Sequence, residues 1–194
     1  MSTPNFEIED KNGRRFWISR SIVVVPVVFT LINDELYTVI EKRGHTVSCS
    51  GRWSVPCGYL DYDETLEEAC IREIKEETGV DVDIENLYFI GYNSTPEGNK
   101  QNVSMRFCCF VPNNVGLDIS KISTKDEVDE LKWLYVGKIK SDNFSAISQF
   151  FPLTLTLSNE YNNNNIKWAF NHKDLILDVI VKYFKLFGKT LEIK

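Results

Sequence analysis

This sequence has no apolar stretch of the roughly 20 residues that a transmembrane helix needs. Its most apolar segment, residues 22–32, is short and contains Pro26 and Thr30. The first ten residues have neither the basic start nor the apolar core of a secretory signal peptide. We therefore expect a cytoplasmic protein that does not associate with a membrane.

The sequence also has fewer basic than acidic residues. The chain has 28 acidic and 22 basic residues, for a net charge of −6. Broad binding to nucleic acid needs a basic face that neutralises phosphates, so no nucleic-acid partner is expected. A small anionic substrate is compatible with this balance, because a bound cation can supply positive charge.

Histidines and paired cysteines are scarce. The only histidines are His45 and His172, so we do not expect a site that depends on histidine. The five cysteines are odd in number and include no CxxC pair. This pattern predicts reduced thiols rather than a disulfide framework or a zinc site.

The 194 residues, 43% of them hydrophobic, suffice for one domain with a modest appendage. We place the main domain at residues 1–140 and a C-terminal helical extension at 141–194. The extension is expected to pack on the same domain, with a homodimer through its apolar face as the alternative. Apolar runs bounded by turn residues predict strands at 6–9, 15–19, 21–32, 36–41, 53–60, 82–92, 103–111 and 131–136. Helices are expected at 65–78, 144–151 and 169–187.

The helix at 65–78 has the clearest pattern. Thr65 and Glu68 have the spacing of a capping box, and Gly79 stands where a left-handed C-terminal cap belongs. Its polar face carries three glutamates at i, i+3 and i+4, whose mutual repulsion is offset in part by Arg72, four residues before the second of them. Such glutamates usually just form a solvated face, but a divalent cation would make the cluster favourable. The three residues are Glu73, Glu76 and Glu77.

The wider spacing decides between these interpretations. Residues 58–80 read Gly58-x5-Glu64-x7-Arg72-Glu73-Ile74-x-Glu76-Glu77-x-Gly79-Val80. This segment resembles the signature of the Nudix hydrolases, the MutT-like family. The resemblance extends more loosely over about residues 20–137. One departure is Cys57, where the family often has a second glycine, although no ligand side chain is lost.

The resemblance implies an α/β fold: a Nudix-type α/β/α sandwich with a mixed β-sheet, in which the signature forms a loop–helix–loop. It also implies a metal-dependent pyrophosphohydrolase that cleaves a nucleoside diphosphate linked to another moiety, with Mg²⁺ or Mn²⁺ as cofactor. Metals neutralise the anionic diphosphate and lower the pKa of a bound water, and a carboxylate then accepts its proton.

By the same likeness, Glu73, Glu76 and Glu77 would bind the metal, with Gly58 contributing its carbonyl oxygen. Arg72 would orient the carboxylates through charge-assisted hydrogen bonds, and Glu64 would support the loop. The general base is left open among glutamates inside and outside the signature. The first outside candidate is Glu127, whose alternative role is a solvated loop acid, and the second is Glu97.

The substrate is less well marked. Pro96, sixteen residues after Val80, slightly favours an ADP-ribose or nucleotide-sugar substrate, although such a proline is more often only a turn residue. Tyr59 is a candidate for stacking on a base, and Arg52 for binding phosphate. The alternative function is a nucleotide-binding sensor without turnover, which the complete signature disfavours.

Overall fold

The structure is a computed structural model that describes residues 6–96, 101–113, 115–141 and 152–194. Its longer helices are α1 (Leu66–Thr78) and α2 (His172–Leu186), and short 3₁₀ helices cover Ile84–Asn86 and Ile119–Lys121. The strands are β1 (Phe6–Glu9), β2 (Arg15–Ile18), β3 (Ser21–Ile32), β4 (Glu35–Arg43), β5 (Trp53–Ser54), β6 (Gly58–Tyr59), β7 (Leu87–Asn93), β8 (Asn102–Phe110), β9 (Val128–Ser141), β10 (Leu153–Leu157) and β11 (Leu191–Ile193).

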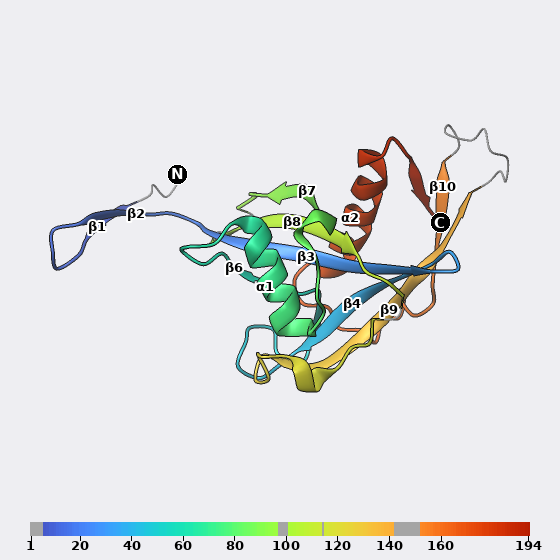
Figure 1. Ribbon diagram of the computed structural model, residues 1–194, viewed down its shortest axis with the longest axis horizontal. Helices are drawn as coiled ribbons and strands as arrows, with labels where there is room; N and C mark the ends of the chain where they lie inside the picture. Colours follow the sequence, from blue (N-terminus) through green and yellow to red (C-terminus); the bar gives the residue numbers. More distant parts are fainter. Residues whose placement is uncertain (1–5, 97–100, 114, 142–151) are drawn as a thin grey trace.

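In the described part of the chain, the body of the molecule is a mixed sheet of nine strands, which Figure 1 shows from one side. Its main path runs β11-β10-β9-β4-β3-β8-β7, and the short strands β5 and β6 pair with β4 and β3. The central strand β3 is parallel to β8 and antiparallel to β4. A strand in this position is covered on both faces, which accounts for its nearly continuous run of valines.

One helix covers each face of the sheet, and β3 contributes to both interfaces. Val24 and Val28 belong to clusters that include residues of α1, whereas Val25, Val27 and Phe29 belong to the cluster that includes α2. Side chains of a strand point alternately to opposite faces, so one strand serves both layers. The predicted α/β/α sandwich with a mixed sheet is confirmed.

Helix α1 begins and ends where the sequence predicts. The Thr65 hydroxyl accepts a hydrogen bond from the Glu68 amide at 3.2 Å, and the Glu68 carboxylate accepts one from the Thr65 amide at 2.8 Å. Gly79 has a left-handed backbone with φ of 72°. These caps satisfy backbone groups that the helix cannot pair internally and fix the helix relative to its flanking loops.

Several predicted boundaries were wrong for identifiable reasons. The strand expected at 82–92 begins only at Leu87, because Ile84–Asn86 forms a 3₁₀ turn. The extended segment 53–60 is interrupted at Pro56, which has no amide to donate to a ladder. Strand β9 is longer than expected and pairs with β4 through two register shifts. The helix expected at 144–151 lies outside the described residues.

The C-terminal segment is not purely helical in its described part. Strand β10 pairs antiparallel with β9, and β11 pairs parallel with β10, so both strands extend the main sheet. Helix α2 starts at His172 rather than at 169, because Phe170 has a left-handed backbone. Its buried residues, Leu175, Ile176, Val179 and Ile180, join the main hydrophobic core. The division at residue 140 stays a prediction.

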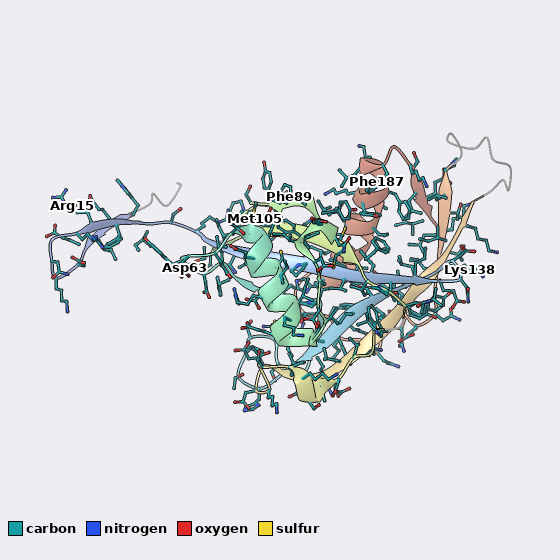
Figure 2. All side chains as sticks on the ribbon, in the orientation of Figure 1. Arg15, Asp63, Phe89, Met105, Lys138 and Phe187 are labelled. Carbon is teal, nitrogen blue, oxygen red and sulfur yellow. The ribbon has the colours of Figure 1, made fainter. Side chains whose placement is uncertain are left out.

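The N-terminal strands β1 and β2 form a separate two-stranded hairpin that projects from the body (Figure 1). Its turn contains Asn12 and Gly13, a pair typical of tight hairpin turns, and Gly13 has a positive φ of 79°. Figure 2 shows Arg15 out on this hairpin, away from the sheet and both helices. Among the described residues, neither helix is long and apolar enough to cross a membrane.

Candidate active site

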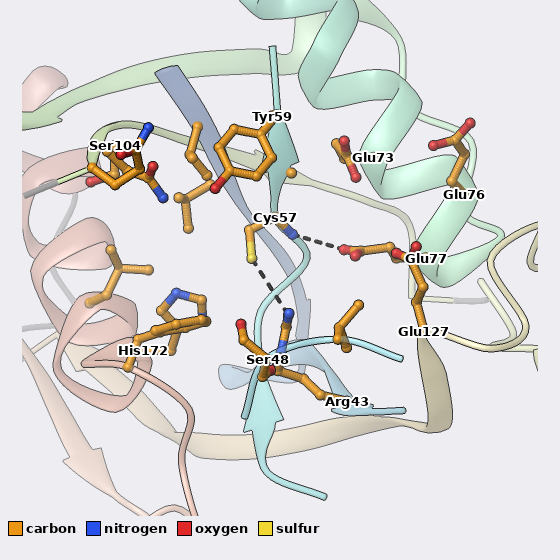
Figure 3. Close-up of a pocket in the computed structure, with 18 of the residues that line it drawn as sticks. Arg43, Ser48, Cys57, Tyr59, Glu73, Glu76, Glu77, Ser104, Glu127 and His172 are labelled. Carbon is orange, nitrogen blue, oxygen red and sulfur yellow. Dashed lines mark hydrogen bonds between the residues drawn. The ribbon is translucent and has the colours of Figure 1, made fainter. Parts of the chain in front are cut away.

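A cleft of about 1010 Å³ separates helix α1 from the start of helix α2 (Figure 3). One wall is formed by α1 and the β6 segment, and the other by β4 and residues 170–175. A cleft of this size accommodates a nucleotide-sized ligand. The carboxylates of α1 therefore face a wall that comes in part from a distant segment of the chain, residues 170–175.

The three glutamates of α1 differ in their exposure. Glu73 and Glu77 are buried, whereas the Glu76 side chain is 37% exposed. All three line the cleft, and Figure 3 shows them on the α1 side. Burial raises the pKa of Glu73 above its ordinary value, an effect that the Arg72 guanidinium partly opposes. The site thus confines negative charge where water cannot fully solvate it.

Arg72 is the main cation of this wall. Its Nη1 donates to Glu73 at 2.7 Å and to Glu76 at 3.2 Å. Its Nε and Nη2 donate to Glu64 at 2.9 and 2.6 Å, and Nη2 also donates to the Tyr59 carbonyl at 3.0 Å. Hydrogen bonding to Arg72 lowers the pKa of Glu64. One guanidinium therefore ties the signature loop to two glutamates of the helix.

Gly58 lies directly against Glu73. A Cβ built at residue 58 would lie 1.9 Å from the Glu73 Oε1 atom. No side chain fits in that space, so glycine is required for the close approach of the loop backbone to the carboxylate. The neighbouring Cys57 contributes through its backbone, because its amide donates to the Glu77 Oε2 atom at 2.8 Å. This contact does not depend on the side chain at residue 57, which explains why cysteine is accepted there.

A third buried carboxylate, Glu41 on β4, lies beside Glu77. It is fully buried, accepts a hydrogen bond from the Ser54 hydroxyl at 3.0 Å and has Arg43 Nη1 at 3.5 Å. Burial raises the pKa of Glu41 to about 7, and burial together with the Glu41 charge raises that of Glu77 well above its ordinary value. Glu41 was not predicted from the sequence, although an acid in an otherwise apolar strand pattern is the signal that could have identified it.

The residues fit a divalent cation, although no tight cage is formed in advance. Within the described part of the chain, no three acidic, histidine or cysteine side chains already converge as a metal group. Magnesium keeps several waters and needs only one or two carboxylates together with substrate phosphates. Two features suit it: the cradle that Gly58 leaves for Glu73, and the buried Glu41 Oε2 atom, which has no hydrogen-bond partner among the residues that the structure describes. Both place hard oxygen atoms, the ligand type that Mg²⁺ prefers, in the buried part of the site.

Of the other predicted site residues, two line the cleft and two lie outside it. Glu127 lines the cleft on an exposed loop, and Tyr59, 54% exposed, lines it beside Gly58. Arg52 is exposed, donates to the Trp168 carbonyl at 3.3 Å and is not among the residues that line the cleft. Pro96 is also exposed and outside the lining. Glu97 lies outside the described residues.

The opposite wall was not anticipated from the sequence. It includes Arg43, Phe170 and His172. His172 is buried and its Nδ1 accepts a hydrogen bond from the Val55 amide at 3.2 Å. Burial, with the nearby arginine charges, lowers the pKa of His172 to about 3, so the imidazole is neutral at physiological pH. It positions the start of α2 and is not a proton carrier near neutrality.

Comparisons with known proteins agree with this architecture. The ADP-ribose pyrophosphatase of Methanocaldococcus jannaschii is 29% identical over 145 residues, which cover 75% of this chain and 66% of that protein. A MutT/nudix family protein from Enterococcus faecalis superposes with a TM-score of 0.65 at 20% identity, covering 88% of this chain and 64% of that one. The Nudix domain of Shewanella oneidensis NrtR, solved with ADP ribose, gives a TM-score of 0.58 at 18% identity, covering 87% of this chain and 90% of that one.

This chain thus spans slightly less than two thirds of the archaeal relative and of the Enterococcus protein. The two structural matches establish the fold. The model of the NUDIX domain family matches residues 23–153, which include the whole signature, the central strands and β9. By this match over most of its length, the chain belongs to the NUDIX domain family.

Proposed function

We propose that the protein is a divalent-metal-dependent pyrophosphohydrolase that cleaves a nucleoside diphosphate linked to another moiety. The observation that carries the proposal is that Gly58, Arg72 and the three glutamates of α1 lie together on one wall of a nucleotide-sized cleft. ADP-ribose is the first candidate substrate, because the archaeal relative is named for it and the NrtR domain was solved with it. Nucleotide sugars are the second candidate class.

In this proposal Glu73, Glu76 and Glu77 hold Mg²⁺ or Mn²⁺ together with the Gly58 carbonyl. The bound metal supplies charge neutralisation at the diphosphate and makes an attacking water more acidic. Arg72 keeps Glu73 and Glu76 in position through the hydrogen bonds described above. Charge-assisted contacts of this kind restrict the carboxylates to a single arrangement before the substrate enters.

Glu127 is our first candidate for the general base. It is exposed, it lies on the cleft wall, and its negative charge is close enough to raise the pKa of Glu73. The Gly44 amide donates to its carbonyl at 2.6 Å, which fixes the backbone of the loop and leaves the carboxylate at the cleft. The water oxygen bonds to phosphorus, the phosphoanhydride bond breaks, and two phosphomonoesters leave; from ADP-ribose these are AMP and ribose 5-phosphate.

The test is a panel of ADP-ribose, a nucleotide sugar, a dinucleotide and a nucleoside triphosphate, each with Mg²⁺ or Mn²⁺, with products separated by anion-exchange chromatography. We expect release of a mononucleotide from at least one diphosphate-linked substrate. Glu76→Gln should lower kcat about 10²-fold or more, as loss of a group that acts in the transition state does. Glu85→Gln, an exposed change in a 3₁₀ turn away from the cleft, is the matched control and should keep full activity.

Two outcomes would contradict the proposal. Absence of cleavage across the panel, together with tight nucleotide binding, would favour the sensor alternative. Full activity of Glu76→Gln would remove the metal-binding role of the α1 carboxylates, even if hydrolysis itself were observed.

A further inference from the structure

We propose that Phe170, backed by Arg43, is a stacking platform for the nucleobase of the substrate. This inference rests on the proposed function and extends it, since it assigns the residue that would recognise the base. The platform lies on the wall opposite α1, in the C-terminal segment, where the signature has no residues. Figure 3 shows Arg43 and His172 on this side of the cleft, across from Glu73 and Glu76.

Phe170 is a large aromatic side chain that is half-exposed to solvent in the cleft. It is 51% exposed and lines the cleft, whereas its neighbour Ala169 is fully buried and His172 is 5% exposed. An apolar ring that packs against a buried arginine and a buried histidine would normally be buried as well, because covering it removes apolar area from water. Its exposure toward a cleft therefore indicates that a ligand covers it.

The backbone holds the ring in this position against its conformational preference. Phe170 has a φ of 52°, a left-handed value that bulky residues avoid. The segment is fixed on both sides, because the Ala169 amide donates to the Trp53 carbonyl at 2.8 Å and His172 accepts from the Val55 amide. Strained backbone that the surroundings enforce occurs preferentially at sites where ligands are clamped.

The chemistry of the contacts suits a planar heterocycle. The Arg43 guanidinium carbon lies 5.4 Å from the centroid of the Phe170 ring, and the His172 ring centroid lies at 5.1 Å. Arg43 is 8% exposed and is itself anchored, since its Nε donates to the Ser48 carbonyl at 2.7 Å. The ring is thus packed against an arginine whose guanidinium is held in place by a hydrogen bond. Proteins bind bases by stacking them on aromatic rings, whatever the identity of the base.

The position of the platform matches the geometry of the substrate class. The carboxylates that would hold the diphosphate are on α1, and a nucleoside extends from a diphosphate by a ribose before the base begins. The base therefore needs a surface away from α1, on the far side of the same cleft. Asn171, the N-cap of α2, also lines the cleft there and makes no capping hydrogen bond with its side chain, so its amide can face the edge of a stacked base. Tyr59, by contrast, is attached next to Gly58 at the reacting end.

The experiment compares two ligands that differ only in the base. AMP and ribose 5-phosphate are titrated calorimetrically into the wild type, Phe170→Leu and Phe170→Tyr in the presence of Mg²⁺. Phe170→Leu keeps an apolar side chain but removes the π face, and should weaken AMP about tenfold, within the range of base–aromatic stacking, while ribose 5-phosphate binding stays unchanged. Phe170→Tyr should bind AMP as the wild type does.

Phe187→Leu is the matched control, because Phe187 is 53% exposed at the end of α2 and does not line the cleft. It should change neither affinity. A second measurement uses Phe170→Trp, whose additional fluorescence relative to the wild type should be quenched by AMP and not by ribose 5-phosphate. In a turnover assay with ADP-ribose, Phe170→Leu should raise KM and leave kcat within about twofold.

The proposal is overturned if Phe170→Leu weakens both ligands equally, or if wild-type protein binds AMP no tighter than ribose 5-phosphate. Neither result depends on turnover, so the platform can fail while hydrolysis stands. Conversely, base-dependent binding that needs Phe170, without any cleavage, would support the platform and refute the hydrolase.

Discussion

Replacing Glu41 by glutamine is expected to stabilise the metal-free protein above neutral pH. Glu41 is buried on β4 beside Glu77, and burial raises its pKa from 4.5 to about 7. Of the groups that face it, Ser54 and Arg43 favour the charged carboxylate, whereas the negative charge of Glu73 disfavours it. A glutamine keeps the size of the side chain, removes the charge and offers an amide donor to the Glu77 carboxylate.

The magnitude follows from the proton balance. The native protein holds a proton that the unfolded chain releases between pH 4.5 and about 7, so the free energy of unfolding falls as the pH rises through this window. The full effect above pH 7 is at most about 3 kcal/mol. The advantage of Glu41→Gln should therefore grow from near zero at pH 4.5 toward this limit at pH 8, or roughly 6–12 °C in Tm for a chain of this size.

Thermal unfolding in EDTA at pH 5, 6, 7 and 8 measures this difference. Glu192→Gln, an exposed change on β11, is the control and should shift stability by less than about 0.5 kcal/mol at every pH. Added Mg²⁺ should then stabilise the wild type more than Glu41→Gln, because only the wild type has the full buried negative charge to neutralise. A variant that is less stable at pH 8, or an advantage that does not change with pH, would refute this reasoning.

Further predictions concern Gly58, His172 and Thr65. Gly58→Ala should displace Glu73 and weaken Mn²⁺ binding about 10- to 100-fold, as measured by calorimetry, whereas Gly116→Ala, where a Cβ meets nothing within 4 Å, should not. The pKa of His172 is lowered to about 3, so below pH 6.5 the unfolded chain binds a proton that the native state does not bind, and the native state loses stability. His172→Gln should reduce this loss, which is measured as the difference in urea unfolding between pH 7 and pH 4. Thr65→Ala should cost about 1 kcal/mol through loss of the helix cap, and a Tm unchanged from the wild type would contradict that role.

The parts of this protein that could be predicted from sequence are those that depend on near neighbours in the chain. The caps of α1 are encoded within four residues at each end, and Arg72 lies within hydrogen-bonding reach of Glu76 because both are on one helix. The hairpin at Gly13 is likewise set by its own turn. These features are confirmed because no distant segment competes with them.

The parts that escaped prediction depend on packing between distant segments. The proximity of Glu41 to Glu77 arises only when α1 is laid across β4, and no local pattern specifies which β4 side chain will face the helix. The wall formed by Arg43, Phe170 and His172 needs the C-terminal segment to fold back over β4 and β5. Arg52 shows the opposite error, because an arginine near the signature in sequence lies outside the cleft in space.

The separation of the cleft into two walls has a consequence for how such a protein can diversify. The wall that carries the carboxylates comes from one short helix and its flanking loops, whereas the facing wall combines the end of β4 with residues 170–175, which follow α1 by more than ninety residues. If Phe170 binds the base as proposed, substitutions around it would alter which substrate is bound without disturbing the glutamates of α1. Selection acting on residues 170–175 could then change the choice of substrate while the proposed catalytic residues stay the same.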